Sequence, residues 1–181
     1  VSVFKGIRYA TADRFEPSVL DRTTWSNRRD ATAYGPQAPQ VPGTMERLLG
    51  ESSQPTDEDC LTLNVFAPAH PGPHPVIVWI HGGPFTNGAG SVPWYDGSNV
   101  ARRHDVVVVT INYRLGAFGF LGDTNLGIGD QIQALRWINA EIAAFGGDAN
   151  RVTIMGESAG GSSVITLMAS PDASELFTAA I

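Results

Sequence analysis

The sequence predicts an α/β fold, in which helices cover the faces of a mostly parallel sheet. Residues 76–80 and 106–111 are continuous apolar runs. Runs without polar alternation are typical of strands that are buried on both faces of a parallel sheet. Further along the chain, helical and strand patterns follow one another in turn, which is the order of elements that α/β folds show.

The first part of the chain predicts two strands and long loops. Residues 3–9 predict a short strand. Residues 61–65 alternate between apolar and polar side chains, which predicts a half-exposed strand. Residues 13–59 contain five prolines and little periodicity, so we expect mostly surface loops there. Residues 68–75 are rich in proline and predict a turn that cannot join a sheet ladder.

The second part predicts a helix, a strand and another helix. Asp130 is the expected N-cap of the first helix, because Gln133 follows three residues later. The buried face of this helix is expected to be one apolar stripe: Ile132, Leu135, Ile138 and Ile142. The glycines at 146–147 end it. Residues 151–155 then predict a strand, and residues 159–169 a helix.

The composition excludes several classes of partner. Twelve Lys and Arg against 18 Asp and Glu give a net charge of −6, so we expect no nucleic-acid partner. No apolar run approaches the roughly 18 residues of a membrane span, so we expect no membrane partner. Cys60 is the single cysteine, which rules out an internal disulfide.

The strongest chemical motif is Gly156-Glu157-Ser158-Ala159-Gly160, which matches the G-x-S-x-G nucleophile elbow. A serine on a tight strand-to-helix turn adopts strained backbone angles, and small flanking residues let the chain fold back there. The motif lies between a predicted strand and a predicted helix, as the mechanism requires. The alternative is a glycine-rich turn with an unreactive serine.

A second motif, Ile80-His81-Gly82-Gly83-Pro84-Phe85, directly follows the predicted strand at 76–80. Glycines at the end of a strand can present bare backbone N–H groups to an anion, which is what an oxyanion hole requires. The alternative is a simple turn that ends the strand.

These motifs and the segments around them resemble type-B carboxylesterases, the family of cholinesterases and bacterial para-nitrobenzyl esterases. The resemblance implies an α/β-hydrolase fold, of which residues 1–181 would be the N-terminal portion of a single domain, with the C-terminal portion absent from this chain. The matching blocks run in family order across nearly the whole chain, at residues 4–7, 58–61, 81–83, 112–116, 118–121, 125–131, 145–148 and 156–161.

The resemblance implies a serine carboxylic-ester hydrolase that acts on short-chain or aryl esters through an acyl-enzyme intermediate. Ser158 would be the nucleophile. Gly82, Gly83 and Ala159 would form the oxyanion hole. Phe85 and Trp94 would line a substrate pocket, with core packing as the alternative for each. This route needs no metal and no organic cofactor, and its partner is a small-molecule ester.

The resemblance also assigns residues that take no part in the chemistry. Glu157 is expected to be structural, because the family's triad acid lies elsewhere. Arg114 and Asp130 are expected to form a buried ion pair of the scaffold.

Two residues depart from the family pattern. Pro84 stands where the family has a glycine or alanine that supplies a third oxyanion N–H, and proline has no N–H to give. Ala38 stands where disulfide-bearing relatives have the cysteine that pairs with the equivalent of Cys60. We therefore expect Cys60 to be unpaired and buried, and a cytoplasmic location in a bacterium is favoured.

The triad is incomplete in these residues. Its order in this fold is serine, acid, histidine, so both partners would lie beyond residue 181. The four histidines are His70, His74, His81 and His104. Of these, His81 is expected to shape the oxyanion loop rather than act as the base. We therefore expect a companion C-terminal polypeptide of the same protein.

Three other interpretations compete with the esterase. The first is a non-catalytic binding or adhesion relative. Such a protein would not need the serine of the elbow, so the presence of Ser158 in an intact motif argues against this interpretation. An inactive fragment is the second. A lipase acting at interfaces would need an apolar lid, which the sequence does not mark.

Overall fold

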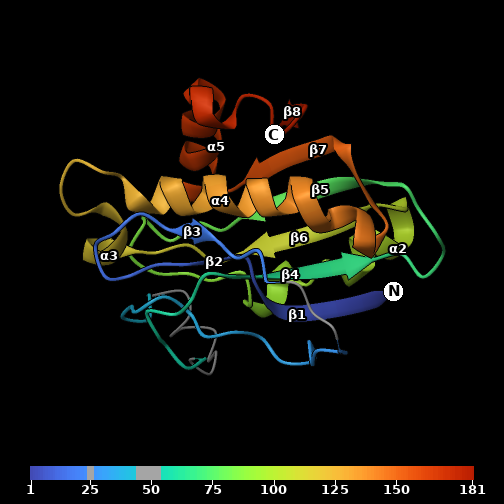
Figure 1. The fold of residues 1–181 in the computed structure, drawn as a ribbon, viewed down its shortest axis with the longest axis horizontal. Helices are drawn as coiled ribbons and strands as arrows, with labels where there is room; N and C mark the ends of the chain where they lie inside the picture. The colour runs from blue at the N-terminus through green and yellow to red at the C-terminus, as the bar shows by residue number, and fades with distance from the viewer. Residues whose placement is uncertain (24–26, 44–53) are drawn as a thin grey trace.

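The computed structural model describes residues 1–23, 27–43 and 54–181, which form a six-stranded sheet with helices on both faces (Figure 1). The strand order is β1-β4-β6-β5-β7-β8. In chain order, the strands are β1 (Ser2–Arg8), β4 (Thr62–Ala67), β5 (His74–Ile80), β6 (Val107–Ile111), β7 (Gly147–Gly156) and β8 (Ala179–Ala180). β5 runs parallel to β6 and β7, and β8 runs parallel to β7, whereas β4 is antiparallel to β1 and β6. The predicted α/β class is confirmed.

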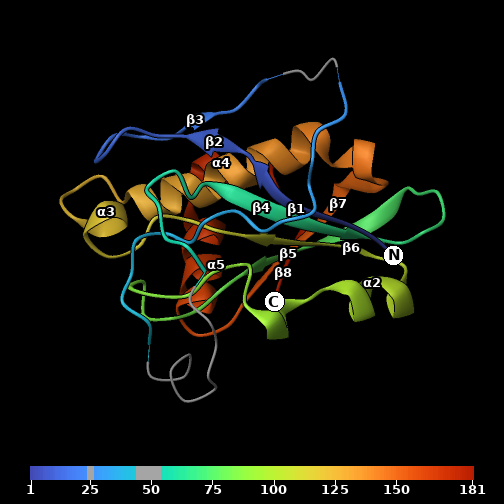
Figure 2. The ribbon, with the colours of Figure 1, turned by 90° about the horizontal axis from the view of Figure 1, so that it is seen from below.

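Helices cover the two faces of the sheet. Figure 2 shows α4 (Leu126–Glu141) on one face and α2 (Ser98–His104) on the other. The remaining helices are α3 (Gly116–Phe120), α5 (Ala159–Ala169) and the 3-10 helices η1 (Pro93–Tyr95), η2 (Ile142–Phe145) and η3 (Pro171–Ala173). Within the described part of the chain, none of the helices combines the length and apolar character needed to cross a bilayer.

The α4 stripe supplies much of the core. All four predicted stripe residues are buried, namely Ile132, Leu135, Ile138 and Ile142. Gly146 adopts a left-handed conformation, with φ of 81°, directly after η2, as the predicted stop requires. The helix 159–169 is found with the predicted bounds.

The loop prediction for residues 13–59 holds for most of the described positions. The exception is the short strand β3 (Val19–Leu20), which pairs with β2 (Ala10–Thr11). Residues 24–26 and 44–53, which also fall in this predicted loop region, lie outside the described residues.

The prediction that residues 61–65 are half exposed is wrong. All six residues of β4 are buried, because the strand lies inside the sheet between β1 and β6 and is covered on both faces. The polar positions that suggested exposure belong to an internal hydrogen-bond network. Asn64 accepts a hydrogen bond from the N–H of Gly6 at 3.0 Å and donates one to Thr110 Oγ1 at 3.0 Å.

Two predicted boundaries are also wrong. β5 begins at His74, so Pro75 lies inside a strand; the ladder with β7 shifts register between His74 and Val76, which is where a strand tolerates proline. α4 begins at Leu126, so Asp130 is not an N-cap but a fully buried residue of the helix interior.

Asp130 instead binds Arg114, which follows β6. The guanidinium donates Nε–H to Oδ2 and Nη2–H to Oδ1, both at 2.8 Å, and Nη1 donates to the carbonyl of Glu16 at 2.7 Å. The side chains are only 5% and 0% exposed. The expected ion pair of the scaffold is confirmed, and it ties the loop after β6 to α4.

We predict that Asp130→Asn lowers the free energy of unfolding by about 3–5 kcal/mol, because it leaves the Arg114 charge buried without a counterion. The measurement is urea unfolding of the intact protein. Asp148→Asn is the control: it removes an ion pair to Arg151 of 3.0 Å in which the side chains are 22% and 53% exposed. That change should alter stability by about 1 kcal/mol or less. Equal effects of the two changes would contradict the prediction.

Cys60 is unpaired and buried, as predicted. Burial raises the pKa of its thiol to about 12. Since only the thiolate reacts, we predict that iodoacetamide at pH 8 leaves the native protein unmodified at this position, with about one thiol in ten thousand ionised. Intact mass reports the adduct, and the same sample in urea should be fully alkylated. Rapid modification of the native protein would show the prediction to be wrong.

Candidate active site

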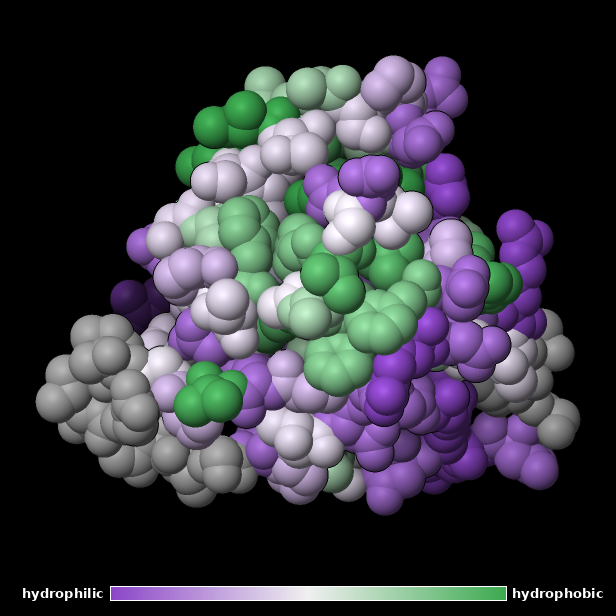
Figure 3. Space-filling view, turned by 90° about the vertical axis from the view of Figure 1, so that its left-hand side faces the viewer, coloured by the Kyte–Doolittle hydropathy of each residue, from purple (hydrophilic) through white to green (hydrophobic). Residues whose placement is uncertain are grey.

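The two predicted motifs leave the sheet side by side. β5 and β7 are parallel neighbours, and Ile80 is in register with Gly156, so the loop after β5 and the turn after β7 emerge at the same edge. Figure 3 looks onto this end of the molecule, where hydrophobic side chains gather in the middle of the face and hydrophilic ones border it. Phe15 and Leu121 are exposed apolar side chains, at 47% and 63%.

The turn after β7 has the geometry of a nucleophile elbow. Ser158 is exposed and has φ of 56° and ψ of −118°, backbone angles that only a tightly constrained non-glycine residue adopts. α5 begins at the next residue, and the N–H of Gly160 donates to the carbonyl of Glu157 at 2.8 Å. The predicted strand–turn–helix context of Ser158 is therefore confirmed.

Gly160 shows why the motif needs its last glycine. A Cβ atom at this position would lie 2.0 Å from the carbonyl oxygen of Ile80, at the end of β5. No side chain fits in that space, so α5 can approach the sheet only with a glycine there.

The loop after β5 passes directly beside the serine. A Cβ atom at Gly82 would lie 3.2 Å from the Cβ of Ser158. Within the described part of the chain, the backbone N–H groups of Gly82, Gly83 and Ala159 donate no hydrogen bond. The three expected donors thus come from the segment beside Ser158 and from the residue that follows it.

A tight turn follows these glycines. Gly83 has φ of 100°, and its carbonyl accepts hydrogen bonds from the N–H groups of Thr86 at 2.9 Å and Asn87 at 3.0 Å. Pro84 is exposed at the tip of this turn. The turn therefore includes Pro84, which has no backbone N–H to donate.

His81 is held inside the protein. Its side chain is 1% exposed, its Nδ1–H donates to the carbonyl of Gly82 at 2.8 Å, and its ring stacks on Tyr113 with centroids 4.5 Å apart. The hydroxyl of Tyr113 donates to the carbonyl of His81 at 2.9 Å, and burial raises the pKa of this tyrosine. These contacts fit the expectation that His81 shapes the loop.

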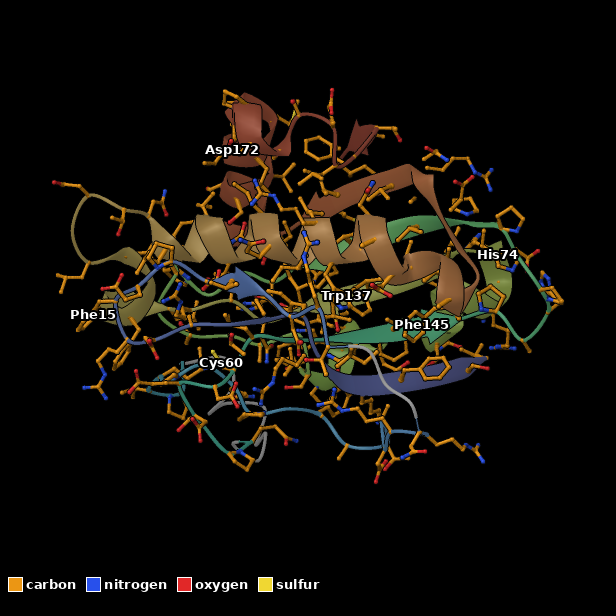
Figure 4. The ribbon with its side chains drawn as sticks, in the orientation of Figure 1. Phe15, Cys60, His74, Trp137, Phe145 and Asp172 are labelled. Carbon is orange, nitrogen blue, oxygen red and sulfur yellow. The ribbon has the colours of Figure 1, made fainter. Side chains whose placement is uncertain are left out.

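The other three histidines lie at the opposite end of the parallel strands. His74 is the first residue of β5, and its Nε2 hydrogen-bonds to the carbonyl of His70. His104 is the last residue of α2, just before β6 starts. Figure 4 shows His74 at the end of the sheet opposite Phe15. A strand of seven residues separates the two ends by about 20 Å.

The two expected pocket residues differ in their surroundings. Phe85 is half-buried, packs against the main core and lies 4.9 Å from the ring of Phe120, so the core-packing alternative describes its contacts. Trp94 is 48% exposed in η1, and its ring lies edge-on to Tyr95 at 6.0 Å. Its role in a pocket stays a prediction.

Sequence reasoning missed Tyr113, which supports His81 with both its ring and its hydroxyl. The signal was present, because Tyr113 continues the two-residue spacing of Val109 and Ile111, and all three belong to the main core. For metals, no group of three or more His, Cys, Asp or Glu side chains is placed to bind an ion in the residues that the structure describes.

Comparison with known proteins gives a consistent result. The sequence model of the group described as "Carboxylesterase family" matches residues 1–181. Phenmedipham hydrolase of Pseudarthrobacter oxydans is 46% identical over 99% of this chain and 38% of its own length. Para-nitrobenzyl esterase of Bacillus subtilis is 51% identical over 100% of this chain and 39% of its own length.

Solved structures agree with these relatives. The structure of a thermophilic PNB esterase superposes with a TM-score of 0.91 at 46% identity, covering 98% of this chain and 39% of that one. This confirms the α/β-hydrolase fold expected from the sequence. The chain spans about two-fifths of the length of the relatives it matches.

We predict that Gly160→Ala destabilises the protein by about 1–3 kcal/mol, because the new methyl group overlaps the carbonyl of Ile80. Gly161→Ala is the matched control in the same helical turn, since a Cβ there would meet the carbonyl oxygen of Gly156 at an ordinary 3.5 Å. The control should stabilise by up to about 1 kcal/mol through helix propensity. Thermal unfolding of both variants checks the prediction, and a control as unstable as Gly160→Ala would refute it.

Proposed function

The chain belongs to the carboxylesterase family, and from that premise we propose that it carries the nucleophile and the oxyanion hole of a serine carboxylic-ester hydrolase. The observation that carries this proposal is the close approach of Gly82 to Ser158 at the elbow, with three backbone N–H groups there that have no acceptor among the described residues. Strain at an exposed serine fits a nucleophile better than a structural turn.

The chemistry follows from this arrangement. Ser158 Oγ attacks the ester carbonyl carbon as a base removes its proton, and the carbonyl oxygen becomes an oxyanion. The N–H groups of Gly82, Gly83 and Ala159 donate to that oxyanion, where negative charge develops. The C–O bond to the alcohol breaks, the alcohol leaves with a proton, and water then releases the acyl group from Ser158 as a carboxylate.

The base and its supporting acid are proposed to come from a companion C-terminal polypeptide of the same protein. Three of the four histidines lie at the far end of the strands, and His81 is buried and bonded to Gly82. The matched relatives are more than twice as long as this chain, which supports a contribution from outside it.

The substrate class proposed is a short-chain or aryl ester. One matched relative is named for para-nitrobenzyl esters, which have an aromatic alcohol. Exposed aromatic and aliphatic side chains at the face of Figure 3 could take such a group. Trp94, which is 48% exposed, is proposed as a further residue of the substrate pocket.

A bacterial cytoplasmic location is also proposed. Two facts support it: Cys60 is free and buried, and the matched relatives of 46% and 51% identity come from bacteria. Reducing compartments favour chains without disulfides.

We predict that a fluorophosphonate adds one phosphonyl group at Ser158 of the intact protein and that Ser158→Ala removes both this adduct and the hydrolysis of p-nitrophenyl acetate. The expected loss of turnover is at least about a thousandfold, since the nucleophile itself is gone. Intact mass and absorbance of p-nitrophenol report the two results.

Ser174→Ala is the control, because Ser174 is exposed and, among the described residues, bonds only to the carbonyl of Pro171 beyond α5. It should keep both activities. Comparison of acetate with palmitate esters separates an esterase from a lipase. An unlabelled Ser158 in the intact protein would favour a binding relative instead.

A further inference from the structure

Two phenylalanines with strained backbone conformations pack their rings against the two phenylalanines of α3. Phe85 has φ of 60° and Phe15 has φ of 63°. Bulky side chains rarely adopt the left-handed region, and the strain is about 1–3 kcal/mol for each residue. Phe85 lies 4.9 Å from Phe120, and Phe15 stacks on Phe118 at 5.9 Å with an interplanar angle of 10°. Each of the two phenylalanine rings of α3 thus contacts the ring of one strained phenylalanine.

The ring of Phe120 packs closely against the backbone of α4 at Gly127. A Cβ atom at Gly127 would lie 2.3 Å from Cζ and 2.6 Å from Cε2 of Phe120. The ring therefore rests on the bare backbone of the first turn of α4. It lies between that helix and Phe85.

Phe85 connects the contact between Phe120 and Gly127 to the loop beside Ser158. Its carbonyl accepts a hydrogen bond from the N–H of Gly116, the first residue of α3, at 2.7 Å. Gly83 lies two residues earlier and closes its own turn onto Thr86 and Asn87. Because both the backbone and the ring of Phe85 are fixed to α3, the position of α3 determines where the backbone of residues 82–84 lies.

We propose that Phe120 is a positioning residue for the oxyanion loop: seated on Gly127, it fixes Phe85 and so sets the distance of the Gly82 and Gly83 N–H groups from the reaction centre. It touches neither substrate nor reacting atoms. This inference rests on the proposed function. Its consequence is that the ring of Phe120 affects the transition state, in which the oxyanion exists, more than it affects substrate binding.

The experiment compares Phe120→Leu with Phe118→Leu in the intact protein, with p-nitrophenyl acetate as the substrate. Both positions lie on α3, both side chains are half-buried, and each supports one strained phenylalanine. Phe120→Leu should lower kcat about 10- to 100-fold with KM within about threefold of the wild type, since a displacement of about 1 Å in a catalytic group has effects of this size. Phe118→Leu should leave kcat within about twofold.

A second pair of variants, both in α4, tests the position of the Phe120 ring independently. A Cβ at Gly127 would meet the ring of Phe120 most closely and the carbonyl oxygen of Arg114 at 2.9 Å. Gly127→Ala therefore pushes the ring towards Phe85 and should also lower kcat with KM retained. Gly129→Ala is its control, since a Cβ there would meet nothing within 4 Å. This pair keeps the test decisive where Phe120→Leu folds poorly, and thermal unfolding of each variant separates a loss of folded protein from a loss of turnover.

Lower kcat in Phe120→Leu and Gly127→Ala, with both controls active, supports the proposal. Wild-type kcat in either folded variant, or an equal loss in Phe118→Leu, overturns it. A wild-type protein that neither hydrolyses the ester nor reacts with a fluorophosphonate overturns the proposed function and this inference together. An active wild type together with a folded Phe120→Leu variant that keeps the wild-type kcat overturns the inference alone.

Discussion

The candidate site depends on one close backbone contact, the approach of α5 to the end of β5. Gly160 lies against the carbonyl of Ile80, and Gly82 lies against the Cβ of Ser158. These two contacts involve the two loops that leave neighbouring parallel strands in register. If either glycine had a side chain, the turn after β7 and the loop after β5 could not lie this close together.

Buried polar contacts then hold the loops that surround this approach. The Arg114–Asp130 pair fixes the segment after β6 to α4 and reaches the carbonyl of Glu16. Tyr113, the residue before Arg114, holds His81 through a hydrogen bond to its carbonyl. Each of these groups would be costly to leave unsatisfied inside the protein, so the network restricts the loops to one arrangement.

Patterns in the sequence predicted the parts of the fold that depend on local spacing. The apolar runs of β5 and β6, the stripe of α4 and the bounds of α5 were all recognisable, because burial leaves a periodic signal. The burial of Asn64 and the position of Asp130 were not. A polar side chain taken by itself predicts exposure or a helix cap. The local pattern did not indicate Thr110 as the partner of Asn64, and it was the family resemblance, not the spacing, that indicated the pairing of Asp130 with Arg114.

In the candidate site, too, features set by local sequence could be predicted and features set by distant partners could not. The elbow could be predicted because its glycines are required by local sterics, whereas the support of Phe85 by Phe120 and Gly127 could not, since it joins three segments through ring contacts. The roles of Ser158, Gly82, Gly83 and Ala159 stay predictions, although the strand–turn–helix context around them is now established.

The strain at Ser158 shows how firmly the turn after β7 is held. A strained conformation persists only where its surroundings determine it fully, and here the glycine contacts and the start of α5 do so. The Nδ1–H of His81 is bonded to the carbonyl of Gly82, and the other three histidines lie at the far end of the strands. Contacts among residues 80–160 therefore fix the conformation of Ser158 and of the loop beside it, which is the preorganisation that the proposed nucleophile and oxyanion donors require.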